Sequence, residues 1–246
     1  MATSLISIIS NNRFYAKLPV WIKRFLQIIL VLQDIIHIKV NLRDSKTLDD
    51  ILKITFNSTF ISPIQIREEI KNLLLILDKA KPKVILEIGT AGGGTLFLFS
   101  NIAHEEAILI SVDLYQAIEK RILFRYIGKE KQKIFLIQGD SHSIETLRKI
   151  EGILRDDKVD FLFIDGDHSY EGVKKDFEMY SPLVRKGGII AFHDIIPDYY
   201  TKYGIKTSSW AGEVYKFWDE VKEKYEHLEI VKDKNQDGFG IGIIIK

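Results

Sequence analysis

The chain has 246 residues, of which 46% are hydrophobic and 28% charged, and its 35 basic side chains nearly balance 34 acidic ones. This composition is typical of a globular protein and excludes a disordered or fibrous chain. A formal net charge of +1 provides no global field that attracts DNA or RNA, so we expect no nucleic-acid partner. The sequence has no cysteine, which excludes disulfides, thiolate zinc sites and cysteine nucleophiles, and we expect a cytoplasmic protein.

The N-terminal region is apolar but interrupted by charges. Met1 to Ser10 lack a basic region and a cleavage site, so no secretory signal is expected. Trp21 to Val40 have the periodicity of an amphipathic helix, and the longest uncharged run, Phe25 to Gln33, is much shorter than the roughly 20 residues of a membrane-spanning helix. We therefore expect no transmembrane segment. The helix must bury its apolar stripe against its own domain, a second subunit of a homo-oligomer or a membrane surface; the stripe comprises Phe25, Ile28, Ile29, Leu32, Ile35 and Ile36.

A change of pattern divides the chain into a helical extension, residues 1–62, and a second domain, residues 63–246. Ser62 and Pro63 suit the cap and first position of a helix over Pro63 to Leu77. From Lys83 onward, short apolar runs alternate with amphipathic stretches. Because the runs are almost continuously apolar, both faces of the sheet are covered, which indicates a doubly wound α/β fold with a mostly parallel seven-stranded sheet and an antiparallel C-terminal strand. The predicted strands are 84–88, 107–112, 134–137, 159–164, 189–192, 228–231 and 240–245, and the predicted helices are 95–103, 116–127, 144–154, 173–183 and 210–225.

The loop after the first predicted strand has the composition of a cofactor loop. Ligands of such sheets bind beyond the carboxyl ends of the strands. Gly89, Gly92, Gly93 and Gly94 allow positive φ angles and a close approach of backbone to ligand, and the next helix presents free amides there. The second strand ends in Asp113, where a carboxylate can accept the hydroxyls of an adenosine ribose. That feature suits nicotinamide dinucleotides and S-adenosylmethionine equally.

Two patterns favour a nicotinamide-dependent oxidoreductase as the alternative enzyme. Gly89-x-Ala91-x-x-Gly94 is a variant of the dinucleotide fingerprint, and Tyr170-x-x-x-Lys174 has the spacing of the catalytic pair of short-chain dehydrogenases. That pair, however, follows the fourth strand, within a cluster of acids. A further alternative is a non-catalytic protein that binds the cofactor and assembles through its N-terminal helix.

The ordered motifs resemble those of class I S-adenosylmethionine-dependent methyltransferases. The resemblance covers about Ile64 to Lys246 and is nearest to the sugar and macrolide O-methyltransferases, of the cephalosporin hydroxylase and rhamnosyl O-methyltransferase type, and more distant to the catechol type. The motifs are Glu87-x-Gly89-x-x-x-Gly93-x-Thr95, Asp113, Gly139-Asp140-Ser141, Phe163-Ile-Asp-Gly-Asp-His-Ser-Tyr-Glu-Gly172 and Gly187-Gly188-Ile-Ile-Ala-Phe-His-Asp194.

The resemblance implies S-adenosyl-L-methionine as cofactor and assigns residues to its parts. Glu87 and the loop over Gly89, Thr90 and Gly93 to Thr95 would hold the methionine part. Asp113 would bind the ribose, Asp140 and Ser141 would flank the adenine, and Asp165 is expected at the cofactor as well. Independently of the family, a carboxylate facing the loop suits an ammonium group better than a pyrophosphate.

Acids after the fourth and fifth strands predict a metal site. Adjacent strands would place Asp165 and Asp194 side by side, and two oxygen donors with room for water suit Mg²⁺. In the related O-methyltransferases, acids here bind a divalent cation that positions the acceptor hydroxyls. Those relatives often show two consecutive acidic or amide ligands on the fifth strand, whereas this chain has His193 and Asp194.

Methyl transfer to oxygen needs proximity and a deprotonated hydroxyl. We expect His168 as the base, since histidine titrates near neutral pH, and Asp167 as the second choice. The aromatic segment from Ile195 to Trp210 suits either acceptor recognition or a subunit contact. The sequence therefore predicts an O-methyltransferase for a small-molecule or glycosidic hydroxyl, helped by Mg²⁺.

Overall fold

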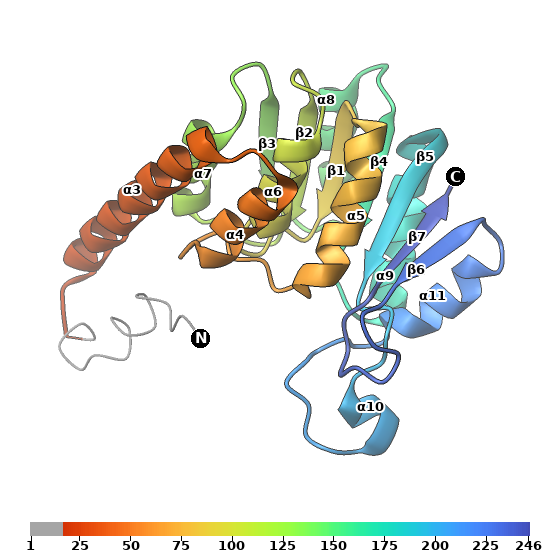
Figure 1. The fold of residues 1–246 in the computed structure, drawn as a ribbon. Coiled ribbons are helices and arrows are strands. Elements are labelled where there is room, and N and C mark those ends of the chain that lie inside the picture. The colour runs from red at the N-terminus through yellow and green to blue at the C-terminus, as the bar shows by residue number, and fades with distance from the viewer. Residues whose placement is uncertain (1–16) are drawn as a thin grey trace.

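The computed structural model describes residues 17–246 and shows a seven-stranded sheet with helices on both faces (Figure 1). The strand order is β3-β2-β1-β4-β5-β7-β6. Strand β7 runs antiparallel to β5 and β6, and the other six strands all run in one direction. The predicted fold class is confirmed. The strands are β1 (Val84–Ile88), β2 (Ile108–Asp113), β3 (Lys133–Gln138), β4 (Val159–Ile164), β5 (Val184–His193), β6 (His227–Ile230) and β7 (Ile241–Ile245).

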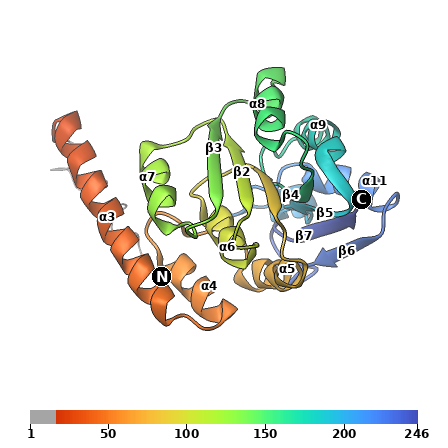
Figure 2. The same ribbon diagram turned by 90° about the horizontal axis from the view of Figure 1, so that it is seen from above.

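Two apolar layers cover the faces of the sheet (Figure 2). On one face, the Phe99 ring contacts the rings of Phe161 and Phe163 at centroid distances of 5.0 and 5.3 Å. On the other face, Trp218 packs against Phe192 at 5.8 Å. The first layer is formed by α3 (Val20–Asp44), α4 (Leu48–Asn57), α5 (Arg67–Ala80), α6 (Gly94–Ile102) and α7 (Ile118–Ile127); the second is formed by α8 (Ile144–Leu154), α9 (Tyr170–Tyr180) and α11 (Val214–Lys222).

The helix predicted from Pro63 begins four residues later, at Arg67. The residues from Phe60 to Pro63 instead cross the glycine loop in an irregular conformation: a Cβ on Gly94 would lie 2.4 Å from the Ile61 carbonyl oxygen and 2.7 Å from the Pro63 nitrogen. This prediction was wrong because tertiary packing overrides the local preference of a Ser-Pro pair for a helix start.

Two helices were absent from the prediction. A capping box forms at the start of α4, since the Thr47 hydroxyl accepts from the Asp50 amide and the Asp50 carboxylate accepts from the Thr47 amide. The short α10 (Tyr199–Tyr203) lies within the aromatic segment and is capped by Asp198. Only α10, with five residues, is too short to show an apolar periodicity in the sequence.

The long helix α3 packs on α4 and α7 with a face that includes little of the predicted apolar stripe (Figure 1). Its buried residues are Val31, Asp34, Ile35 and Ile38, so only Ile35 of the predicted stripe is buried. By length and composition alone, α3 is long and apolar enough to cross a membrane. The rest of the protein buries 22% of its most apolar 18-residue stretch. Residues 1–16, including the start examined for a secretory signal, lie outside the described part of the chain.

Candidate active site

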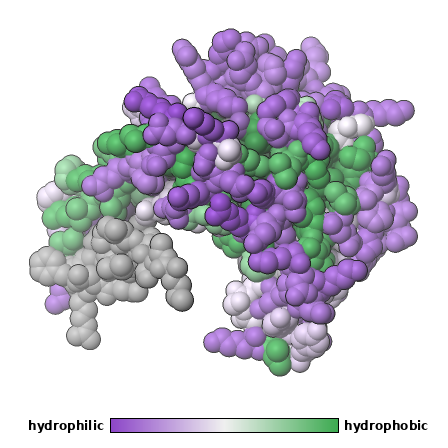
Figure 3. Space-filling model, viewed as in Figure 1, coloured by the Kyte–Doolittle hydropathy of each residue, from purple (hydrophilic) through white to green (hydrophobic). Residues whose placement is uncertain are grey.

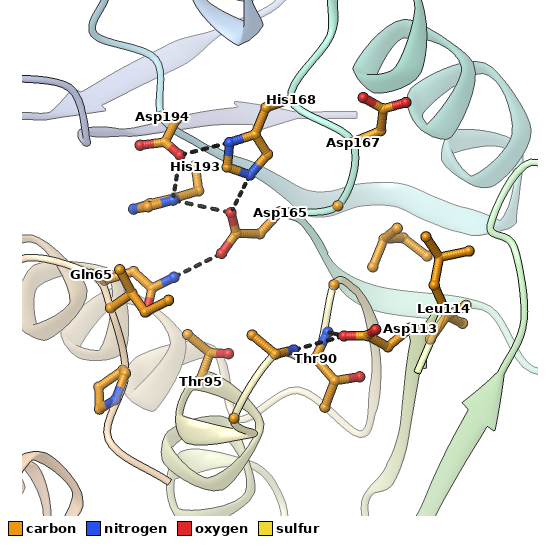
Figure 4. Close-up of a pocket in the computed structure, with 18 of the residues that line it drawn as sticks. Gln65, Thr90, Thr95, Asp113, Leu114, Asp165, Asp167, His168, His193 and Asp194 are labelled. Carbon is orange, nitrogen blue, oxygen red and sulfur yellow. Dashed lines mark hydrogen bonds and ion pairs between the residues drawn. The ribbon is translucent and has the colours of Figure 1, made fainter. Parts of the chain in front are cut away.

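A cavity of about 680 Å³ opens beyond the carboxyl ends of β1, β2, β4 and β5 (Figure 4). Parallel pairing brings these ends together, because Ile88 pairs with Val112 of β2 and with Ile164 of β4. The size is ordinary for a small-molecule site. Most of the predicted site residues line this cavity; Glu87 and Gly93 do not.

Close contacts with other protein atoms explain why the loop after β1 contains glycines. A Cβ on Gly89 (φ +91°) would lie 2.0 Å from the Asp165 carbonyl oxygen, and one on Gly93 (φ +89°) would lie 2.6 Å from the Phe124 ring. Gly92 and Gly94 face the backbone of residues 60–63 in the same way. The loop is therefore packed between β4, α7 and the segment before α5, and Gly89 still leaves its backbone on the cavity wall.

Glu87 lies behind the wall. Its carboxylate is fully buried and accepts hydrogen bonds from the hydroxyls of Thr95 and Ser111. Burial, which the two hydroxyl donors only partly offset, raises the pKa of Glu87 to about 7. Glu87 itself does not line the cavity, whereas Thr95, whose hydroxyl donates to Glu87, does.

Asp113 fastens the loop to the end of β2. Its Oδ2 accepts from the amides of Thr90 and Ala91 at 3.0 and 2.8 Å, and Oδ1 accepts from the Tyr115 amide at 2.9 Å. The carboxyl group remains partly exposed on the cavity wall (Figure 4). The Thr90 hydroxyl is in turn held by Ser111 and by Gln116, whose Nε2 lies 2.7 Å away.

The predicted adenine residues lie at the end of β3. Asp140 and Ser141 line the cavity, and Asp140 Oδ1 accepts from the amide of His142 at 2.8 Å. His142 also lines the cavity and places Nε2 3.3 Å from the buried Asp176. Sequence reasoning missed His142, although it directly follows the motif.

At the other end, two carboxylates and two imidazoles form a compact cluster (Figure 4). His193 Nδ1 lies 3.1 Å from Asp165 Oδ1 and 3.3 Å from Asp194 Oδ2. His168 approaches the same two oxygens at 3.4 and 3.2 Å. Asp194 has a left-handed backbone (φ +61°), a conformation that for a non-glycine residue is concentrated at functional sites. We call Asp165, His168, His193 and Asp194 the acid–histidine cluster.

Charge neutralisation dominates the electrostatics of this cluster. Burial lowers the pKa of His168, but the hydrogen bond and charge of Asp165 and the charge of Asp194 outweigh it and raise the pKa to about 8. Burial lowers the pKa of His193 too, yet Asp165 and Asp194 hold it well above its usual value. Burial raises the pKa of Asp165, but the charge of His193 and the hydrogen bonds from the two histidines outweigh it, so the pKa lies below its usual value. At neutral pH both rings are therefore mainly imidazolium.

The group of side chains whose atoms could share a metal ion includes His168 and not the predicted His193. Asp165, His168 and Asp194 offer atoms that all lie within 4.8 Å of one another. His193, predicted as a ligand, directs Nδ1 at the two carboxylates, and its Nε2 is buried without a hydrogen-bond partner among the described residues. His193 is thus placed to hold the acids together.

Asp167, the second predicted base, belongs to the start of α9. Its Oδ1 accepts from the Ser169 amide at 2.9 Å, and that backbone hydrogen bond lowers its pKa. Figure 4 shows its carboxylate turned away from Asp165. The Tyr170 and Lys174 pair does not line the cavity, and the Tyr170 hydroxyl donates to Glu220 instead.

Segments far apart in the chain complete the wall. Gln65 Nε2 donates to Asp165 Oδ2 at 2.7 Å, and the Phe239 amide donates to Asp194 Oδ1 at 3.0 Å. Trp210 stacks on His168 with a centroid distance of 5.4 Å, and its carbonyl oxygen lies 2.8 Å from His168 Nδ1. Of the predicted acceptor segment, Ser208, Ser209 and Trp210 line the cavity. No local motif marks Gln65 or Phe239.

Comparison with known proteins agrees with this geometry. Residues 86–195, which run from within β1 to just past β5 and contain the acid–histidine cluster, match a family model described as a methyltransferase domain. The fold is that of the class I S-adenosylmethionine-dependent methyltransferases.

Related proteins cover different parts of the chain. An uncharacterised protein of Acanthamoeba polyphaga mimivirus, R132, is 31% identical over 115 residues, which are 44% of this chain and 50% of that protein. The chain thus matches about half the length of this relative. The O-methyltransferase from Bacillus cereus, solved with SAH, shares 17% identity with a TM-score of 0.61 over 82% of this chain and 92% of that one. TomG from Streptomyces achromogenes, solved with SAM, shares 15% identity with a TM-score of 0.53 over 85% and 96%. Both structures share the fold of this chain.

Proposed function

We propose that this protein transfers the methyl group of S-adenosylmethionine to a hydroxyl oxygen of a small-molecule or glycosidic acceptor. The observation that carries the proposal is the charge of the cavity. Of the described residues that line it, five are aspartates and none is lysine or arginine, so the lining stays negative although His168 and His193 offset two of the carboxylates. Carboxylates favour a ligand that carries a sulfonium and an ammonium group, and they disfavour a pyrophosphate. The donor set therefore fits S-adenosylmethionine better than a nicotinamide dinucleotide.

The wall offers each part of such a cofactor suitable neighbours. The partly exposed carboxylate of Asp113 would accept the ribose hydroxyls, and Asp140 with Ser141 would border the adenine. The backbone around Gly89 and the side chains of Thr90 and Thr95 would face the methionine part. When bound, the cofactor supplies an electrophilic methyl group, and the wall holds it in line with the acceptor oxygen.

The acid–histidine cluster would serve the acceptor. As a base, His168 must be in its deprotonated form, which predominates only above a pH of about 8. In that form its ring, stacked on Trp210 and lining the cavity, would take the proton of the acceptor hydroxyl. Asp165 and Asp194 would then stabilise the imidazolium, since both carboxylates lie within 3.5 Å of that ring.

The same cluster fits a divalent cation. Two carboxylates suit Mg²⁺ or Mn²⁺, and an imidazole shifts the preference toward a transition metal. Asp165 and Asp194 would hold such an ion. His168 could join them only after giving up its ring proton, and it would then be a ligand in place of the base. A bound ion would make an acceptor hydroxyl more acidic. We expect activity to fall in chelator and to recover more fully with Mn²⁺ than with Mg²⁺.

Transfer of labelled methyl from S-adenosylmethionine to a panel of sugars and phenols tests the proposal. We expect the His168→Ala variant to bind S-adenosylhomocysteine normally and to turn over about 100-fold more slowly, the usual range for loss of a general base. His227→Ala, which alters an exposed histidine on β6, serves as the control. Cofactor binding without transfer to any hydroxyl acceptor would contradict O-methylation and favour the non-catalytic alternative. Unchanged turnover of His168→Ala would remove this residue as the base.

A further inference from the structure

Helix α3 presents an apolar face that the domain does not cover. Its N-terminal half projects beyond the helices and strands of the domain (Figure 1), and Figure 3 shows the hydrophobic surface that runs along it. Trp21, Phe25 and Ile36 are 60–70% exposed, while no residue from Val20 to Leu30 is buried. A contiguous face of this kind marks an interaction surface. We call it the α3 face; it comprises Trp21, Phe25, Ile28, Leu32, Ile36 and Val40.

The exposed charges around the α3 face are mostly basic. From residue 17 to the end of α3, the exposed charged side chains are Lys17, Arg24, Lys39, Arg43 and Asp44. The other acid of this stretch, Asp34, is buried. The first 33 residues of the sequence contain four basic side chains and no acidic one. The complementary partner is therefore anionic.

A second copy of this chain does not provide that complement. Two α3 faces packed together would bring four exposed basic residues of each helix against only one exposed acid, Asp44, of the other, so most of the positive charge would stay unpaired. A lipid surface rich in anionic head groups satisfies both requirements, because acyl chains take up the apolar face and the head groups neutralise the cations. We propose that α3 docks this protein on an anionic membrane surface.

The helix lies on such a surface and does not span it. Asp34, near its middle, accepts from the Ser58 hydroxyl at 2.6 Å and from the Phe60 amide at 3.2 Å, so the C-terminal half is fixed to the domain. The remaining half, Val20 to Leu30, is about 16 Å long at 1.5 Å per residue, which is too short for a hydrocarbon core of about 30 Å. Its exposed Trp21 and Phe25 suit the depth of the interface.

Flotation of the full-length protein with lipid vesicles tests the proposal. We expect binding to vesicles of equal parts phosphatidylcholine and phosphatidylserine to be at least ten-fold stronger than to phosphatidylcholine alone, and to weaken at high salt. Trp21→Ser combined with Phe25→Ser should reduce binding to the anionic vesicles at least ten-fold, and Arg24→Glu should reduce it several-fold. The matched controls are Ile144→Ser with Leu228→Ser, and Arg148→Glu; these exposed residues lie on α8 and β6.

Several outcomes would overturn the proposal. It fails if the wild-type protein does not float with anionic vesicles, or floats equally with both compositions. It also fails if the α3 variants change a dimer to a monomer in light scattering while vesicle binding stays unchanged, because the second copy is then the occupant. Thermal unfolding should be the same for all variants, since the replaced side chains are exposed.

Discussion

At the scale of single residues, Glu87 shows how burial and hydrogen bonding compete for one carboxyl group. Full burial favours the neutral acid, whereas the Thr95 and Ser111 hydroxyls favour the carboxylate; burial is the stronger effect, and the pKa rises from 4.5 to about 7. Between these two values the folded protein binds more protons at Glu87 than the unfolded chain does. The free energy of unfolding therefore falls as the pH rises through this window.

The Glu87→Gln variant should lose this pH dependence. The neutral amide keeps the shape of the side chain, so relative to the variant the wild type should lose up to about 3 kcal/mol of unfolding free energy between pH 5 and pH 8. Urea denaturation at both pH values measures the difference, and the other titrating groups cancel because both proteins contain them. If the unfolding free energies of wild type and variant change equally between the two pH values, folding does not raise the pKa of Glu87.

At the scale of elements, the N-terminal helices are connected to the active site through one buried carboxylate. Asp34 of α3 holds Ser58 and Phe60, and the residues that follow cross the glycine loop and place Gln65 on Asp165. The predicted boundary after residue 62 therefore falls inside a segment that packs as one unit with the cavity wall. A continuous series of contacts therefore joins α3 to this wall.

Replacement of Asp34 by alanine should destabilise the protein. The buried Ser58 hydroxyl and the Phe60 amide would lose their acceptor, which costs about 2–3 kcal/mol of unfolding free energy. Asp44→Ala, at the exposed end of the same helix, should change it by less than about 0.5 kcal/mol. Chemical denaturation measures both values. Equal, small effects would mean that α3 is not fixed by this contact.

The local sequence pattern predicted the bounds of helices and strands well where those bounds do not depend on distant parts of the chain. The strands 84–88 and 159–164 have the predicted bounds because their apolar runs end where burial ends, and the helix 144–154 has them because Ser143 caps its start. The start predicted at Pro63 was wrong, and the domain buries only Ile35 of the stripe predicted for α3, for a shared reason. Both depend on which distant segment packs against them, and local periodicity contains no such information.

At the scale of the whole molecule, the cavity depends on contacts between distant parts of the chain. The strand ends supply Asp113, Asp140, Asp165 and Asp194, which topology alone predicts to meet. Gln65 reaches the acid–histidine cluster from before β1, and Trp210 and Phe239 reach it from the connections after β5, so no spacing in the sequence indicates them. The glycines were predicted to approach a ligand; in the structure a Cβ on Gly89, Gly93 or Gly94 would also lie within 3.0 Å of a protein atom.

Another buried acid fastens the C-terminal end. Glu69 of α5 accepts from the amides of Lys232 and Gly240 at 3.0 and 2.9 Å and from Gln236 Nε2 at 2.8 Å. Asp237 in the same connection accepts from the Tyr199 amide and the Thr207 hydroxyl. The β6–β7 connection thus ties α5 to the segment that precedes Trp210, and it carries Phe239 to the cavity.

Calorimetric titration of S-adenosylhomocysteine into the wild type, Asp113→Ala and Asp160→Ala tests the central claim most directly. Asp160 accepts from the Lys83 and Val84 amides at the amino end of β1, so its loss removes a similar carboxylate–amide contact far from the cavity. We predict saturable binding to the wild type, at least ten-fold weaker binding to Asp113→Ala and unchanged binding to Asp160→Ala. Absence of binding to the wild type, or equal weakening by both variants, would contradict the assignment of this cavity to S-adenosylmethionine.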